Sequence, residues 1–137
     1  MQREINLPLT IQVGVGVTIS RMPDESLRIA DSAGSQPGQR ILTLEGPLVL
    51  KDMFEFQATV RADQSQTLII DFTKVPYVDS AGIGALVGAY VTRQHSSRKL
   101  ALVGVVKRVH DALAVTHVEQ FFTFFETVAD AERASAA

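Results

Sequence analysis

The sequence contains no cysteine, no run of lysine or arginine and no long apolar stretch. The lack of cysteine excludes a disulfide framework, a thiolate metal site and a cysteine nucleophile, and it suits a reducing compartment such as the cytoplasm. No segment approaches the roughly 18 consecutive apolar residues that span a bilayer, so we expect no membrane insertion. The 13 basic and 15 acidic residues nearly cancel, which argues against nucleic acid as a partner.

The chain has 137 residues, of which 46% are hydrophobic, enough for one domain with a single core. Residues 5–19 alternate apolar and mostly polar positions with a period of two, which predicts a strand with one buried face. Pro8, Gly14 and Gly16 weaken it and favour an edge position or a partner chain, so a homodimer through this strand stays open. We therefore divide the chain into an N-terminal β extension (1–25) and a folded domain (26–137).

The folded domain alternates strand and helix patterns. Residues 26–30 and 40–45 predict a hairpin, and residues 51–63 predict a helix whose buried face carries Met53, Phe56 and Val60. The apolar runs at 67–72 and 100–103 are typical of parallel strands covered on both faces, and they are expected at the centre of the sheet. They flank a helix at 81–94, whose expected buried face contains these residues: Ile83, Leu86, Val87, Tyr90 and Val91.

The C-terminal part repeats this alternation. Val106, Val109 and Leu113 predict another helix, the phenylalanines at 121–125 predict a strand, and a last helix is expected to start near Thr127. The order of elements indicates an α/β fold with a βαβ unit around helix 81–94.

Ser80 stands where the central strand passes into helix 81–94, a place where ligands or partners often meet an open α/β sheet. Serine is a preferred N-cap, so Ser80 could simply cap the helix. Alternatively, Ser80 could be phosphorylated, since an anion is favoured by about 0.3–1 kcal/mol near a helix N-terminus. A phosphate would add about −1.5 to −2 charges beside Asp79 and so change partner binding.

Gly82 and Gly84 each cost roughly 1 kcal/mol of helix propensity relative to alanine. Two explanations remain open: tight packing on the sheet, or close approach of another molecule. With Gly88 they invite a dinucleotide-binding interpretation, but the third glycine is one place late and no acidic residue follows the next strand. A nucleotide-binding protein or an enzyme is therefore only a third hypothesis.

The other candidate chemical groups do not form a recognisable site. Asp71 and Asp79 could be a carboxylate pair, and His95, His110 and His117 could be ligands or bases. None of them shows metal-ligand spacing or a hydroxyl neighbour placed for a triad. We predict no catalytic residue, no metal and no cofactor.

Two motifs carry a resemblance to a known family. Leu68-Ile-Ile-Asp-Phe is followed by Val78-Asp-Ser-Ala-Gly-Ile-Gly-Ala-Leu, and with them residues 26–134 resemble the STAS domain of bacterial anti-sigma factor antagonists. The resemblance implies a mixed sheet of four to five strands with about four helices packed mainly on one side. The N-terminal strand would be an addition to this fold.

The resemblance also implies a regulatory cycle without catalysis by the chain itself. The unmodified antagonist binds an anti-sigma factor that is also a serine kinase, the kinase phosphorylates the serine at the position of Ser80, and a phosphatase resets it. The residues implied in partner binding surround that serine: Asp79, Ser80, Ala81, Gly82, Ile83 and Gly84.

Two positions depart from the family pattern. Val49 stands where members often have aspartate, and His117 stands where many have glycine, so the loop at His117 must differ unless the histidine tolerates a positive φ. These departures favour a second hypothesis, a STAS scaffold or accessory subunit of a signalling or lipid-transport complex in which Ser80 is not phosphorylated.

Overall fold

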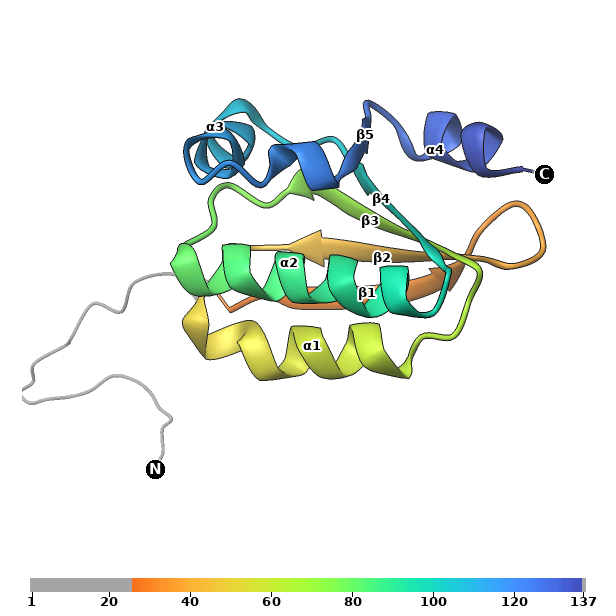
Figure 1. Cartoon of the computed structure of the whole chain (residues 1–137), viewed down its shortest axis with the longest axis horizontal. Coiled ribbons are helices and arrows are strands. Elements are labelled where there is room, and N and C mark those ends of the chain that lie inside the picture. Colours follow the sequence, from red (N-terminus) through yellow and green to blue (C-terminus); the bar gives the residue numbers. More distant parts are fainter. Residues whose placement is uncertain (1–25, 137) are drawn as a thin grey trace, which may run out of the picture.

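The structure is a computed structural model that describes residues 26–136 (Figure 1). The strand predicted over 5–19 and the N-terminal β extension lie outside the described residues. The described part contains one five-stranded sheet in the order β1-β2-β3-β4-β5. The strands are β1 Arg28–Ala33, β2 Gln39–Glu45, β3 Thr67–Lys74, β4 Lys99–Val103 and β5 Thr123–Phe125.

Strands β1 and β2 form the predicted hairpin and pair antiparallel, whereas β2, β3, β4 and β5 are mutually parallel. The helices between and after them are α1 Met53–Ala62, α2 Ser80–His95, α3 Lys107–Val115 and α4 Val128–Ser135, with short 3-10 turns η1 Leu50–Asp52 and η2 Glu119–Phe121. The mixed α/β fold with four helices predicted from the sequence is confirmed.

Three of the four helices share one face of the sheet. Each parallel strand lies directly beside the one before it in the chain, and crossovers of one hand that advance in one direction put their helices on the same side. The main core accordingly joins Phe56 of α1, Leu86 of α2 and Leu113 of α3 to the sheet. Helix α4 packs through Ala131 in a separate, smaller cluster with Ile69, Ala101 and Val103.

Strand β3 occupies the centre of the sheet, as its apolar run predicts. Leu68, Ile70 and Phe72 belong to the main core, whereas Ile69 belongs to the α4 cluster. All four side chains are fully buried. The strand is covered on both faces because helices lie on both sides of it. Its side chains alternate between the two faces, so an unbroken apolar sequence fills both cores.

The predicted buried face of α2 is partly wrong. Leu86 is buried, and Ile83, Val87 and Tyr90 are half-buried and pack against the main core, but Val91 is 49% exposed. The other residues that α2 buries are small or charged: Gly82, Ala85, Ala89 and Arg93. Small side chains let the helix axis approach the sheet and the loop at Leu48 closely, so the larger apolar residues lie at the flanks of the contact.

The phenylalanine run forms only a short strand. Thr123–Phe125 pairs with β4, whereas Phe121 ends the 3-10 turn η2 and is 40% exposed. Phe122 is buried in the main core. Among residues 26–136, no helix combines the length and apolar content needed to cross a membrane.

Candidate functional site

The segment from β3 to α2 is held by backbone contacts with the loop after β2. The Leu48 N–H donates to the Tyr77 carbonyl at 3.2 Å, and the Asp79 N–H donates to the Leu48 carbonyl at 3.3 Å. Leu48 and Val78 form an isolated parallel bridge, which extends the pairing of β2 and β3. The start of α2 is therefore fixed against the sheet's carboxyl edge.

Asp79, and not Ser80, is the N-cap of α2. One Asp79 carboxylate oxygen accepts from the Gly82 N–H at 2.8 Å, and the other accepts from the Leu50 N–H at 3.1 Å. A carboxylate has two acceptor oxygens, so this residue satisfies a free N–H of α2 and ties down η1 at the same time. The interpretation of Ser80 as the cap is wrong.

Ser80 is the first residue of α2, and it is exposed. Its hydroxyl makes no hydrogen bond with any residue in the described part of the chain. Ala81 and Ile83 are half-buried, Gly82 is buried and Gly84 is exposed. The predicted site residues therefore lie together at the amino end of α2, but only Ser80 and Gly84 are exposed to solvent.

Gly82 and Gly84 have different reasons for being glycine. A Cβ on Gly82 would lie 2.2 Å from the Leu48 carbonyl oxygen, so no side chain fits there. A Cβ on Gly84 would have no heavy atom within 4 Å outside its own turn. Packing against the Leu48 loop explains Gly82, whereas no contact within the described domain requires a glycine at position 84.

Two exposed apolar side chains lie on the η1–α1 segment, which contacts the start of α2 through Leu50, and the sequence pattern did not predict them. Leu50 is 64% exposed and Phe54 is 80% exposed, and the Leu50 N–H bonds directly to Asp79. We call Leu50, Phe54, Ser80 and Gly84 the Ser80 face. The available signal was that Leu50 and Phe54 do not fit the buried helical face formed by Met53, Phe56 and Val60.

The remaining chemical candidates are not brought together. Asp71 accepts from the Thr73 N–H at 2.9 Å and the Thr73 hydroxyl at 2.6 Å, which is a local turn contact. His110 contacts the Phe124 ring at 5.1 Å between centroids. Residues 26–136 contain no group of three or more side chains that could hold a metal ion.

His117 adopts the positive φ that its position requires. Its φ is 62°, its N–H donates to the Ala114 carbonyl, and the next N–H, of Val118, donates to the Leu113 carbonyl. These two bonds form the motif that commonly ends a helix with glycine in a left-handed conformation. The loop after α3 thus keeps the glycine-type geometry although a histidine occupies it.

The comparison with protein families identifies the domain. A family model described as STAS domain matches residues 32–131. The chain belongs to the STAS domain family. This match spans all of the sheet except residues 28–31 of β1, and it includes Ser80, Leu50 and Phe54.

Solved structures with this STAS fold include regulatory proteins and a transporter. An anti-sigma factor antagonist from Mycobacterium paratuberculosis has a TM-score of 0.71 at 18% identity, over 82% of this chain and 96% of that one. The Bacillus cell fate determinant SpoIIAA, an anti-sigma factor antagonist, has a TM-score of 0.65 at 14% identity in its unphosphorylated form, over 78% of this chain and 96% of that one. The phosphorylated form has a TM-score of 0.60 at 12% identity, over 80% and 99%.

A murine anion transporter of the solute carrier 26 family, member A9, has a TM-score of 0.61 at 20% identity. The match covers 79% of this chain but only 22% of that one. At these identities the likeness establishes the fold, and the STAS fold occurs both alone and within a larger transporter.

Proposed function

We propose that this STAS protein is an anti-sigma factor antagonist-like regulator that is controlled at Ser80. When Ser80 is unmodified, the Ser80 face binds an anti-sigma factor with serine kinase activity. The kinase phosphorylates Ser80 and the complex dissociates, and a phosphatase restores the binding form. In this cycle the kinase uses ATP, and the protein itself catalyses no reaction. The cycle takes place in the cytoplasm.

The observation that carries this proposal is the state of the Ser80 hydroxyl. It is exposed, makes no hydrogen bond within the described residues and is not needed to cap α2. A kinase can therefore reach it without unfolding the helix. Because Asp79 does the capping, transfer of a phosphoryl group to Ser80 would leave the hydrogen bonds that start α2 in place.

The residues around Ser80 form a surface suited to binding a partner, and a phosphate on Ser80 would weaken that binding. Leu50 and Phe54 offer apolar area, and Gly84 leaves room for another backbone. A phosphate adds about −1.5 to −2 charges next to the Asp79 carboxylate. Burying that charge against a partner without a matching cation costs about 2–5 kcal/mol, which corresponds to at least a 30-fold loss of affinity.

The fold similarity supports the proposal in one further respect. SpoIIAA has been solved in both phosphorylated and unphosphorylated forms, and each shares the fold of this chain. The STAS fold thus tolerates phosphorylation in that protein. For this chain, the exposed position of Ser80 indicates the same tolerance.

The test combines intact-mass measurement with a binding assay. Candidate anti-sigma factor kinases of the same organism are incubated with the protein and ATP, and a single phosphate is expected on the wild type and none on Ser80→Ala. Ser80→Asp should weaken the complex at least 30-fold. Ser96→Asp, at the opposite end of α2, is the matched control and should bind normally. The absence of any phosphate with every candidate kinase would refute the proposal.

A second function is favoured by a different observation. The solute carrier 26 transporter contains this fold as about a fifth of its length. Val49 and His117 differ in residue type from the antagonist pattern, although the backbone at His117 keeps the glycine-type geometry. The chain would then be a scaffold or accessory subunit of a signalling or lipid-transport complex, with Ser80 unmodified. In that case Ser80→Asp would leave partner capture from the native organism unchanged, whereas Phe54→Ser would reduce it.

A further inference from the structure

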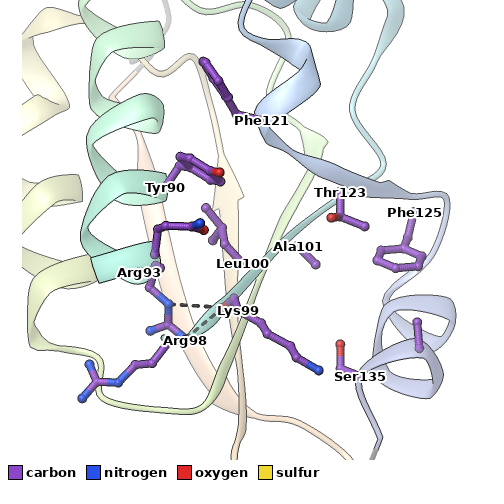
Figure 2. A pocket seen from close by; sticks show the side chains of 12 residues that line it. Tyr90, Arg93, Arg98, Lys99, Leu100, Ala101, Phe121, Thr123, Phe125 and Ser135 are labelled. Atoms are coloured by element: carbon purple, nitrogen blue, oxygen red, sulfur yellow. Dashed lines mark hydrogen bonds between the residues drawn. The ribbon is translucent and has the colours of Figure 1, made fainter. Parts of the chain in front are cut away.

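A cavity of about 380 Å³ lies far from the Ser80 face, between the second half of α2, the edge of β4, strand β5 and the end of α4 (Figure 2). Its volume falls within the range of small-molecule sites, roughly 300–1,000 Å³. Arg93, which lines it, is 13 residues beyond Ser80 on α2, or about 20 Å along the helix axis at 1.5 Å per residue. The cavity is therefore separate from the proposed partner surface.

The cavity exists because β5 is shorter than β4. Strand β5 pairs only with Ala101, Leu102 and Val103, so Lys99 and Leu100 have no strand partner on that side within residues 26–136. Helix α4 ends at Ser135 beside the same opening. The edge of the sheet is thus left uncovered between two helices on opposite faces.

One wall of the cavity is aromatic. The rings of Tyr90 and Phe121 are stacked with centroids 5.4 Å apart and an interplanar angle of 24°. Leu100, Ala101 and Phe125 continue the apolar lining. Figure 2 shows Tyr90 and Phe121 at one end of the cavity and Lys99 at the other, with its side chain running toward Ser135.

The polar groups of the cavity are cationic or neutral. No aspartate or glutamate lines it in the described part of the chain. Lys99 and Arg98 are in no ion pair there, and the hydroxyls of Tyr90, Thr123 and Ser135 make no hydrogen bond with another described residue. These groups are available to a ligand.

Arg93 is different, because its guanidinium is already fully used. It donates to the Asp63 carboxylate at 2.8 Å and to the carbonyls of Ser65 and Lys99 at 2.8 and 3.0 Å. The carboxyl ends of α2 and α4 contribute roughly half a negative charge each. The full positive charge of Lys99 offsets them, and no acidic side chain of residues 26–136 lines the cavity beside it. Figure 2 shows the Arg98 side chain extending away from Lys99 and Ser135, so Lys99 is the cation of the cavity.

We propose that this cavity binds an organic anion that has an apolar or aromatic body. The acidic group of the ligand lies at Lys99, within reach of the hydroxyl of Ser135, and the body packs against Tyr90 and Phe121. An inorganic anion would leave the aromatic wall exposed, and an uncharged apolar molecule would leave the lysine without a counter-charge. The proposal does not depend on phosphorylation of Ser80.

The probe is 8-anilino-1-naphthalenesulfonate, compared with N-phenyl-1-naphthylamine, which has the same ring system without the sulfonate. We expect one sulfonate molecule per chain, with amide chemical-shift changes concentrated at residues 90–101 and 121–135. The uncharged amine should bind at least tenfold more weakly, since a hydrogen-bonded charge is worth about 1.5–3 kcal/mol.

Lys99→Glu should weaken the sulfonate at least tenfold and leave binding of the uncharged amine within a factor of two. Lys51→Glu, an exposed lysine near the Ser80 face, makes the same change in net charge and should have no effect. Ser135→Glu provides a second variant on the opposite rim and should act like Lys99→Glu. Shift changes centred on Leu50 and Phe54, or equal affinities for both probes, would overturn the proposal.

Discussion

Helix α2 is held in contrasting ways at its two ends. At the amino end an aspartate caps the helix and the adjacent serine is exposed. At the carboxyl end Arg93 is 1% exposed, and its guanidinium joins α2 to the Asp63–Ser65 loop and the start of β4. Burial lowers the pKa of Arg93 and the Asp63 carboxylate opposes this, so the group stays charged. Helix α2 is therefore anchored at the end opposite Ser80, where phosphorylation is proposed to add charge.

Removal of the buried Arg93 side chain should have the largest effect on stability. Arg93→Met should lower the free energy of unfolding by about 3–5 kcal/mol, because it leaves the Asp63 carboxylate buried without its partner. Urea denaturation measures the change. Arg61→Met, at an exposed position on α1, is the control and should shift stability by less than about 0.5 kcal/mol. A loss below about 1 kcal/mol for Arg93→Met would show that the anchor is dispensable.

The two glycines at the amino end should respond with opposite signs. Gly82→Ala places a methyl group against the Leu48 carbonyl, and because backbone cannot move aside cheaply it should cost about 1–3 kcal/mol. Gly84→Ala meets no neighbour and should stabilise the domain by about 0.5–1 kcal/mol through helix propensity. Thermal unfolding of both variants provides the measurement. Equal effects would contradict the assigned packing.

The capping roles predict a smaller difference between two adjacent residues. Asp79→Ala should cost about 1–2 kcal/mol, since the N–H groups of Gly82 and Leu50 both lose their acceptor. Ser80→Ala should change stability by less than about 0.5 kcal/mol. Asp79→Asn retains one acceptor oxygen and should fall between them in denaturant midpoint. If Ser80→Ala proved the more damaging variant, the proposed freedom of its hydroxyl would be wrong.

The sequence predicts the buried strands well and the surfaces of the helices less well. Strand β3 is recognisable because it is apolar on both faces. The buried face of α2 is harder to recognise, because Gly82, Ala85 and Ala89 are buried although they are small. Of these, Gly82 lies against the Leu48 carbonyl, and no periodicity of large apolar residues marks that contact. From the sequence, Arg93 would be expected on the solvated face of the helix. In the structure it is buried because the Asp63–Ser65 loop packs around its guanidinium.

The sequence predicts the position of the candidate site at the start of α2, but it does not predict which residue caps the helix. Asp and Ser are both preferred N-caps, so the sequence alone cannot choose between Asp79 and Ser80. Asp79 is favoured as the N-cap because its second carboxylate oxygen accepts a hydrogen bond from the Leu50 N–H, in another part of the chain. The same bond brings the exposed Leu50 next to the start of α2. Contacts between segments distant in sequence therefore decide what the local pattern leaves open.

An exposed ion pair near the carboxyl edge of the sheet should contribute much less to stability than the buried pair of Arg93 and Asp63. Arg28, with help from Lys74, lowers the pKa of the Glu45 carboxyl below its ordinary value of 4.5. Because the pKa is lower in the folded state, the stabilisation is present above about pH 4.5 and is lost as the pH falls through the folded-state pKa. The groups are open to solvent, so the effect should be small and should shrink further in high salt. Unfolding midpoints between pH 3 and pH 7 should therefore fall slightly less at the acid end for Glu45→Gln than for the wild type, and identical pH profiles would show that the pair contributes nothing.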